Sequence, residues 1–268
     1  MDYSKYSALR VEKSQDGITI VKFNQPERLN AFVGEMHRQV EDVFVDLADD
    51  ADVNIVVLTG EGKAFSAGGD IQGMANRAGT AEGWQRVTKI FYTAKRIIDN
   101  ILNFPKPTIA AINGDAMGLG ASVALACDIQ VIAETARIAD THVRVGLVAG
   151  DGGAVIWPLL IGPNRAKDFL MRGKVIKGAE AERLGLVNYV APPGEVLPHA
   201  LQIAGEMNSL PQLAVRWTKV SVNKVLKQQF NLIFDASVAY EMLTMVSQDH
   251  KEAALAFLDK RKPTYKGL

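Results

Sequence analysis

The sequence predicts an α/β fold followed by a helical C-terminal region. Up to about residue 190, short β-branched runs alternate with segments whose apolar residues recur at helical spacing, a pattern typical of an α/β core. From residue 196 onward the apolar pattern is helical throughout. The polar stretch Ala191-Pro192-Pro193-Gly194 is the best linker candidate. We therefore expect a core over residues 1–195 and a C-terminal helical region over residues 196–268.

The N-terminal part begins with two strands and ends in a long helix. Apolar β-branched runs predict strands at 9–12, 18–23 and 54–59. Asn30 is a candidate N-cap for a helix whose apolar residues run from Met36 to Leu47. We expect a short helix, a polar mobile loop and a long helix ended by prolines, at 70–74, 77–83 and 84–102 respectively.

The second half continues the alternation before the helical tail. Strands are expected at 108–112, 128–133, 136–139 and 186–190. Helices are expected at 118–126, 152–160, 164–171 and 179–184. The tail is predicted to contain helices at 196–208, 213–230, 232–246 and 250–260.

Composition excludes several classes of protein. The 268 residues include 30 Lys and Arg and 30 Asp and Glu, so the formal net charge is zero and a basic nucleic-acid-binding domain is not expected. Cys127 is the single cysteine, which excludes an intrachain disulfide and fits a reducing compartment. The first residues are polar, and no apolar run approaches the roughly 20 residues that span a bilayer. We expect a cytoplasmic protein without nucleic-acid or membrane partners.

Two glycine-bearing turns, about fifty residues apart, each lead from an apolar strand into a helix. The first reads Ala64-Phe65-Ser66-Ala67-Gly68-Gly69-Asp70-Ile71, and the second reads Asn113-Gly114-Asp115-Ala116-Met117-Gly118-Leu119-Gly120-Ala121-Ser122. Glycine permits positive φ and close backbone approach, and amides at a helix start have no intrahelical partner. Two such ends facing each other would form an oxyanion hole. The alternative is that these glycines only permit tight packing of strand on helix.

The two turns resemble those of the crotonase family, also called the enoyl-CoA hydratase/isomerase family. Further segments match this family in order and nearly end to end, namely 26–31, 106–114, 127–129, 181–187 and 257–263. The resemblance implies a crotonase-like β-β-α spiral core with a C-terminal helical trimerisation region. It also implies a homotrimer or a dimer of trimers.

The resemblance implies an acyl-CoA thioester substrate, with coenzyme A as part of the substrate and no separate cofactor. The backbone N–H groups of Gly69 and Leu119 would hold the thioester oxygen as it becomes an enolate. Family contacts to coenzyme A fall on Arg28, Ala31, Ala67, Gly68, Ile71, Phe257 and Lys260. Of these, Phe257 and Lys260 are candidates to reach the ligand from a neighbouring subunit. Arg28 and Lys260 suit phosphate by charge, and the alternative for both is an ordinary surface cation.

The sequence departs from the family at the two glutamates that hydratases use. Ser122 and His142 stand at those positions, and serine is not a base at neutral pH without an activator. Asp151 stands where hydratases have a small residue, and some hydrolytic relatives carry a working aspartate there. We therefore take His142 and Asp151 as the leading catalytic candidates, with Ser122 as a third.

Each of these side chains also has a structural alternative. Asp151 could be a helix N-cap, His142 a hydrogen-bonded structural histidine, and Ser122 a small packing residue. Asp140 would orient the imidazole of His142 if this stretch is extended, and is otherwise a solvated loop carboxylate.

The sequence predicts an acyl-CoA-processing enzyme of the hydratase/isomerase family, a lyase or isomerase of fatty acid metabolism. One alternative is a hydrolase that uses His142 and Asp151 on a thioester or on a C–C bond, as in a β-diketone. Another is a non-catalytic acyl-CoA-binding trimer. No Cys/His ligand cluster, H-E-x-x-H or Rossmann glycine motif appears, so neither a metal nor a nicotinamide is expected.

Overall fold

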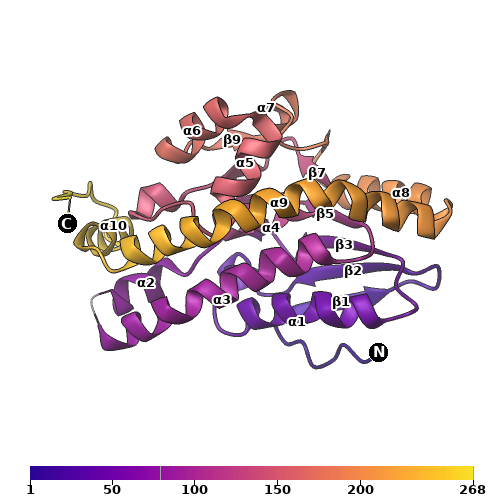
Figure 1. The fold of residues 1–268 in the computed structure, drawn as a ribbon, viewed down its shortest axis with the longest axis horizontal. Coiled ribbons are helices and arrows are strands. Elements are labelled where there is room, and N and C mark those ends of the chain that lie inside the picture. The colour runs from indigo at the N-terminus through magenta and orange to yellow at the C-terminus, as the bar shows by residue number, and fades with distance from the viewer. Residues whose placement is uncertain (79, 268) are drawn as a thin grey trace.

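The computed structural model describes residues 1–78 and 80–267, and its main feature is a six-stranded sheet (Figure 1). The strand order is β1-β2-β3-β5-β7-β10, with β1 antiparallel to β2 and the other neighbours parallel. The strands are β1 (Leu9–Lys13), β2 (Ile18–Phe23), β3 (Ile55–Gly60), β5 (Thr108–Ile112), β7 (Ile129–Ala133) and β10 (Tyr189–Ala191). Strands β3 and β5 are buried along their whole length, which explains their continuous apolar sequence.

A smaller four-stranded sheet carries the segments next to the two glycine turns. Its order is β4-β6-β8-β9, with bounds Ala64–Ser66, Asp115–Met117, Arg137–Ala139 and Ile176–Lys177. Strands β4, β6 and β9 were not predicted, because strands of two or three residues are too short to show a period. The pairing of β4 with β6 brings the two turns to the same edge.

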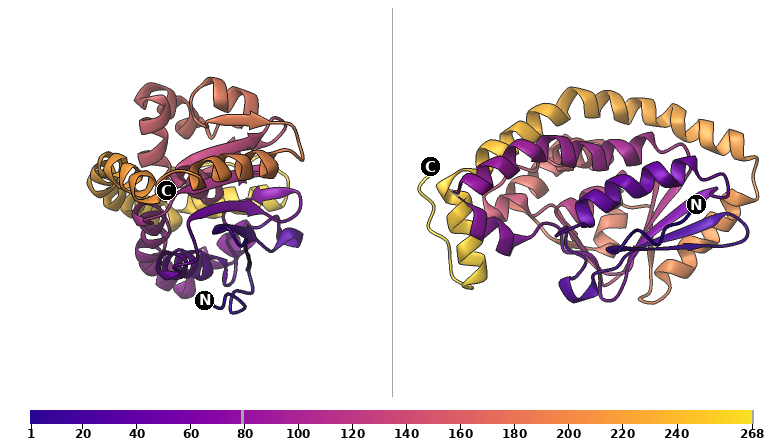
Figure 2. Two further views of the ribbon diagram at one scale, coloured as in Figure 1. Left: turned by 90° about the vertical axis from the view of Figure 1, so that its right-hand side faces the viewer. Right: turned by 90° about the horizontal axis from the view of Figure 1, so that it is seen from below.

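The α-helices surround the large sheet and extend beyond it (Figures 1 and 2). Helix α1 contacts α3, α3 contacts α9, and α8 packs against β3, β5 and β7. Helix α10 contacts α2 at the end of the molecule away from α8. The helices are α1 (Met36–Asp49), α2 (Ile71–Arg77), α3 (Ala81–Asn103), α4 (Leu119–Ala126), α5 (Gly153–Ile161), α6 (Pro163–Arg172), α7 (Gly178–Arg183), α8 (Val196–Asn208), α9 (Gln212–Met245) and α10 (Gln248–Leu258). None of the described helices is both long and apolar enough to cross a membrane.

The α/β core and the helical C-terminal region are as predicted, but some boundaries differ. The two helices expected at 213–230 and 232–246 are one helix, α9, of 34 residues. The expected strand at 186–190 is displaced to Tyr189–Ala191. Helix α3 begins at Ala81 inside the loop expected at 77–83, and residue 79 of that loop lies outside the described residues. The proposed division at residue 195 stays a prediction.

Asn30 does not cap α1, contrary to the sequence prediction. It lies six residues before the helix, which starts at Met36 after Glu35. Its side chain instead accepts a hydrogen bond from the amide of Gln25 and donates to the carbonyls of Glu61 and Ala64, each at 2.9 Å. Asn30 therefore ties the segment before α1 to the loop that leads into β4.

Candidate active site

The two glycine turns lie against each other. Gly68 and Gly118 have φ angles of 82° and 52°, values that side-chain-bearing residues rarely adopt. A Cβ atom on Gly68 would lie 2.4 Å from the carbonyl oxygen of Met117, and one on Gly120 would lie 2.7 Å from the Cβ of Ser66. The glycines therefore permit both the conformation and the tight packing, so the packing interpretation and the functional one are compatible.

The amides that follow these positive-φ glycines are Gly69 and Leu119. Leu119 is the first residue of α4, so its N–H has no intrahelical acceptor. Within the described part of the chain, neither amide donates a hydrogen bond to another residue. Both residues line one cavity of about 320 Å³. Two unpartnered donors in one cavity are what an oxyanion hole would use, and the assignment of Gly69 and Leu119 to such a hole stays a prediction.

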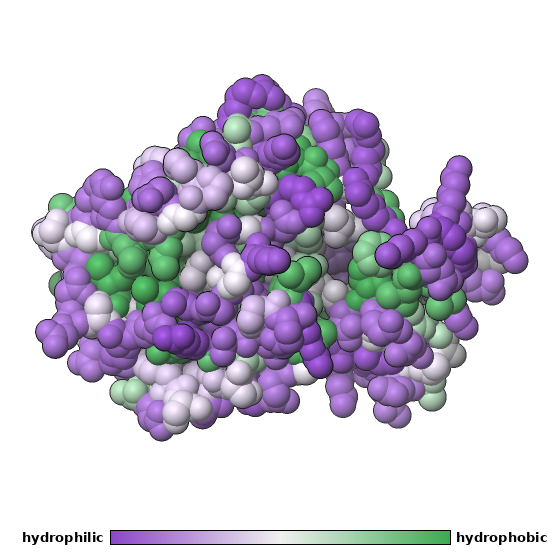
Figure 3. Space-filling model, turned by 180° about the vertical axis from the view of Figure 1, so that it is seen from behind, coloured by the Kyte–Doolittle hydropathy of each residue, from purple (hydrophilic) through white to green (hydrophobic). Residues whose placement is uncertain are grey.

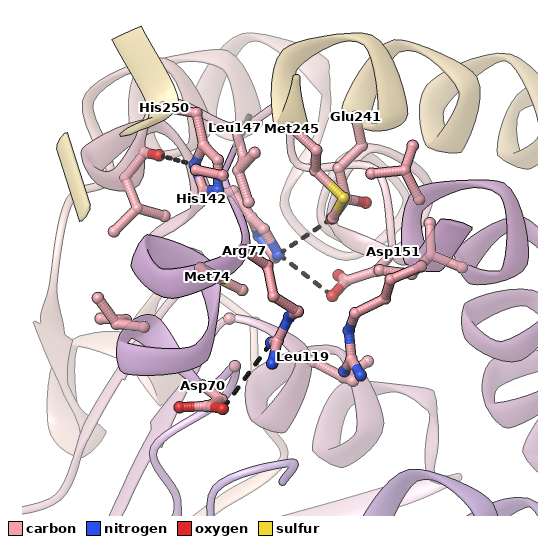
Figure 4. A pocket seen from close by; sticks show the side chains of 18 of the residues that line it. Asp70, Met74, Arg77, Leu119, His142, Leu147, Asp151, Glu241, Met245 and His250 are labelled. Carbon is pink, nitrogen blue, oxygen red and sulfur yellow. Dashed lines mark hydrogen bonds and ion pairs between the residues drawn. The ribbon is translucent and has the colours of Figure 1, made fainter. Parts of the chain in front are cut away.

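The cavity walls are mainly apolar and come from both ends of the chain. Helices α2 and α3 provide one wall, and the end of α9 with the start of α10 provides another (Figure 4). The apolar lining residues are Phe32, Ala67, Ile71, Met74, Ala78, Trp84, Val87, Ile90, Ala94, Leu119, Val145, Leu147, Met245 and Val246. Such a lining favours a compact hydrophobic ligand with few polar groups.

His142 stands in this cavity between two carboxylates. Its Nδ1 atom lies 2.8 Å from an oxygen of Asp140, and its Nε2 atom lies 3.1 Å from an oxygen of Asp151 (Figure 4). His142 begins a short 3₁₀ helix (His142–Val145), so the stretch is not extended as the sequence argument assumed. Asp140 nevertheless holds the imidazole, and it is 2% exposed, so the solvated-loop interpretation of Asp140 is wrong.

Asp151 is held from its other side by Ser122. The Ser122 hydroxyl donates to the second oxygen of Asp151 at 3.2 Å, and both residues are buried. Asp151 does not cap the following helix, because Gly152 is the N-cap of α5 and makes no side-chain capping bond. Ser122 is not among the described residues that line the cavity. The structure therefore places Ser122 as a support for Asp151.

Glu241 is a member of this cluster that sequence reasoning missed. It comes from α9, and its Oε1 lies 4.0 Å from the Nε2 of His142 (Figure 4). Its Oε2 is buried with no partner among the described residues, and Glu241 lines the cavity. The only sign of Glu241 in the sequence is an acidic residue on the apolar face of a long helix. The two glycine turns carry no information about its position.

The charges around His142 change the pKa values of the cluster. Burial by itself lowers the pKa of His142, but the carboxylates of Asp151 and Asp140 outweigh this effect and raise it well above the ordinary value. Burial raises the pKa of Glu241 well above its ordinary value, and nearby Asp151 adds to the effect. The neighbouring carboxylates thus favour the protonated form of His142, and burial favours the neutral form of Glu241.

Ligand atoms of Asp140, His142 and Asp151 all lie within 4.8 Å of one another, a separation that a metal ion could bridge. Each imidazole nitrogen, however, already has a carboxylate partner. The expectation of a metal-free site stays a prediction.

The predicted coenzyme A contacts lie in three places. Ala67 and Ile71 line the cavity, and Gly68 forms the first turn. Arg28 and Ala31 lie in the preceding segment, which joins this turn through the bond from the Ala67 amide to the Leu29 carbonyl. Phe257 and Lys260 lie exposed at the end of α10, which packs on α2 of the same chain. A contribution of these two residues to a neighbouring subunit stays a prediction.

The fold and the paired turns define a class of protein. The enoyl-CoA hydratase/isomerase family matches over residues 13–268, and the chain belongs to this family, which confirms the resemblance and the crotonase-like fold. A crotonyl-CoA hydratase from Syntrophomonas wolfei is 33% identical over 261 residues, which cover 97% of this chain and 98% of that protein.

Solved structures agree with this assignment. An enoyl-CoA hydratase/isomerase from Mycobacterium paratuberculosis has a TM-score of 0.88 at 33% identity, covering 94% of this chain and 99% of that one. A β-diketone hydrolase from the cyanobacterium Anabaena, bound to (S)-3-oxocyclohexyl acetic acid, has a TM-score of 0.80 at 28% identity, covering 91% and 96%. The chain is thus similar to proteins of more than one activity within the family.

Proposed function

We propose that this enzyme hydrolyses the C–C bond between the two carbonyl groups of a 1,3-diketone. The observation that carries the proposal is His142, held by Asp140 and Asp151 and facing a cavity that contains two unpartnered backbone amides. A base that can activate water and a site for a developing oxyanion are the two requirements of this reaction. The likeness to the β-diketone hydrolase from Anabaena supports it.

The reaction begins with water and His142. Asp140 accepts a hydrogen bond from Nδ1, so Nε2 is the nitrogen that exchanges a proton on the cavity side. Once the imidazolium has lost its Nε2 proton, this atom takes a proton from water. The resulting hydroxide adds to one carbonyl carbon of the substrate and forms a tetrahedral intermediate.

Collapse of that intermediate breaks the C–C bond to the carbon between the carbonyls. The electron pair moves into the remaining ketone as an enolate, whose oxygen binds the amides of Gly69 and Leu119. Glu241, kept neutral by burial, protonates the enolate carbon and regains its proton from His142, 4.0 Å away. One water is consumed, a carboxylic acid and a ketone are formed, and no redox change occurs.

A second candidate is the acyl-CoA chemistry for which the family is named. The match over residues 13–268 and the identity with a crotonyl-CoA hydratase favour it. The same amides would bind a thioester oxygen, and Arg28, Ala31, Ala67, Gly68, Ile71, Phe257 and Lys260 would contact coenzyme A. Two observations argue against simple hydration. Ser122 and His142 stand where the family resemblance places the two hydratase glutamates. Ser122 is also absent from the described cavity lining.

A comparison of two substrates tests these candidates. We expect 2,2-dimethylcyclohexane-1,3-dione to be opened to 6-methyl-5-oxoheptanoic acid, detected by mass spectrometry, with no loss in the presence of a metal chelator. Crotonyl-CoA should be hydrated slowly or not at all, as measured by loss of enoyl absorbance. Rapid hydration of crotonyl-CoA without diketone cleavage would overturn the proposal. Binding of acyl-CoA without turnover of either compound would favour the non-catalytic trimer.

We also propose that the chain acts as a homotrimer or a dimer of trimers in the cytoplasm. Helix α9, along the front of Figure 1, carries large apolar side chains that are exposed in the single chain. They are Leu213, Trp217, Val220, Val222, Val225, Leu232, Tyr240 and Leu243. The opposite face in Figure 3 is mainly hydrophilic, with separate hydrophobic areas. Large exposed apolar side chains along one helix support its use as an interface, which sedimentation analysis would test.

A further inference from the structure

Two guanidinium groups line the cavity without a close partner among the residues that the structure describes. Arg77 ends α2, and its nearest carboxylate oxygen, in Asp70, is 3.9 Å away (Figure 4). Arg86 lies in the early part of α3 and forms no ion pair or hydrogen bond with any residue in 1–78 or 80–267. The arginine-bearing wall, Arg77 and Arg86, thus presents donors to the same cavity as His142.

Two acidic residues, Asp70 and Glu82, lie near this wall, and among the described residues neither forms an ion pair with Arg86. Arg86 is exposed, but partial burial and the neighbouring Arg77 lower the pKa of its guanidinium. The carboxylates of Asp70 and Glu82 act in the opposite direction. Asp70 is already engaged, because its other oxygen caps α2 by accepting from the amide of Gly73 at 2.9 Å. An anion placed between the two guanidiniums would relieve their repulsion.

His37 adds an unsatisfied polar atom to the cavity. Its Nδ1 is buried and has no hydrogen-bond partner among the described residues, although the ring lines the cavity. Burial and the nearby Arg86 lower the pKa of His37 to about 4, so the ring is neutral and carries one N–H donor. A buried polar atom without a partner at a cavity wall indicates that a ligand oxygen or a water completes it.

We propose that the arginine-bearing wall binds a carboxylate of the substrate, so that the substrate is a 1,3-diketone that also carries an acid group. This inference rests on the proposed function. Guanidinium forks match planar carboxylates, and most of the other lining residues are apolar. The substrate is therefore a compact hydrophobic body with the diketone at His142 and the carboxylate at Arg86. The phosphates of coenzyme A are the other possible source of an anion here.

Binding of an inert probe tests the site without turnover. Calorimetry would compare cyclohexanecarboxylate with its methyl ester in the unchanged protein, in Arg86→Gln and in Lys89→Gln. Lys89 is an exposed cation on the same helix and is absent from the described cavity lining, so it is the matched control. We expect the acid to bind about ten- to hundredfold more tightly than the ester. Arg86→Gln should remove most of that preference, and Lys89→Gln should leave it unchanged.

Three results would overturn the inference. The first is that the unchanged protein binds acid and ester with equal affinity. The second is that Arg86→Gln keeps the preference for the acid. The third is that Arg86→Gln no longer binds free coenzyme A but still binds the carboxylate probe. The last result would assign the wall to phosphate.

A turnover measurement separates this inference from the proposed function. The substrates are 5-carboxy-2,2-dimethylcyclohexane-1,3-dione and its methyl ester, and the acid should have the higher kcat/KM, with the advantage lost in Arg86→Gln. If the acid probe binds as expected but neither diketone is cleaved, the proposed reaction fails and the anion site stands. If both diketones are cleaved equally well, the reaction stands and the acid-bearing substrate is refuted.

Discussion

Replacing Asp151 with asparagine removes a charge from the cluster and almost nothing else. Asparagine keeps the size of the side chain and an oxygen that can accept from Ser122, 3.2 Å away. It removes the anion 3.1 Å from the Nε2 of His142. At that distance and an effective dielectric constant of about 20, the attraction is roughly 5 kcal/mol before the desolvation of both groups is subtracted. We expect kcat for diketone cleavage to fall by about 10²–10⁴, because His142, the base of the proposed reaction, loses one of the two carboxylates that hold it.

The pH profile gives a second, independent measurement. Because Asp151 helps to raise the pKa of His142, the unchanged enzyme should gain activity as the pH rises above neutrality and the imidazolium loses its proton. Asp151→Asn should lower that pKa, so its smaller activity should reach a plateau at a lower pH. Ser122→Ala is the matched control, since it removes one hydrogen bond to Asp151 but leaves the charge, and it should reduce kcat by roughly tenfold or less.

The assay follows loss of the diketone over a range of pH, with thermal unfolding measured for each variant. An Asp151→Asn enzyme that keeps within threefold of full activity and an unshifted profile would refute the role of Asp151. A large loss of thermal stability with no change in the profile would show that Asp151 is structural.

Three further changes have defined outcomes. Glu241→Gln should lower kcat by about 100-fold without loss of stability, since it replaces a buried neutral acid by a neutral amide; release of ketone, followed by NMR, checks this. Gly68→Ala should lower the free energy of unfolding by at least about 1–3 kcal/mol, because φ is 82° and the new Cβ would lie 2.4 Å from the Met117 oxygen; urea denaturation measures it. Lys219→Met should cost about 3 kcal/mol in the same assay, because it leaves Asp128, 2.8 Å away, without its cation, and an unchanged midpoint would contradict this.

The sequence predicted most of the longer elements because their apolar patterns are local, although α9 was expected as two helices. Strands β3 and β5 are continuous apolar runs, and α4 consists of small and apolar residues that are all buried. Strand β4, in contrast, has only three residues and exists through its pairing with β6, about fifty positions later. Pairing of such short segments is decided by tertiary packing rather than by sequence period.

The residues of the candidate site also differ in whether the sequence could predict their positions. His142 and Asp151 lie nine positions apart, so the turn between them could be expected to bring them together, and their atoms lie 3.1 Å apart. The sequence left open whether Asp140 is a solvated loop carboxylate, because a two-residue offset from His142 does not reveal burial. Glu241 and Arg86 could not be placed, because their distance from the cavity depends on how α9 and α3 pack.

The position of Glu241 near the end of the chain has a consequence for biosynthesis. A ribosome completes Asp140, His142 and Asp151 about ninety residues before it adds Glu241, and α10 follows later still. A chain that ends before α9 therefore lacks Glu241 and the cavity wall that α9 and α10 provide. In the proposed reaction, the proton donor to the enolate is therefore absent until α9 has been made.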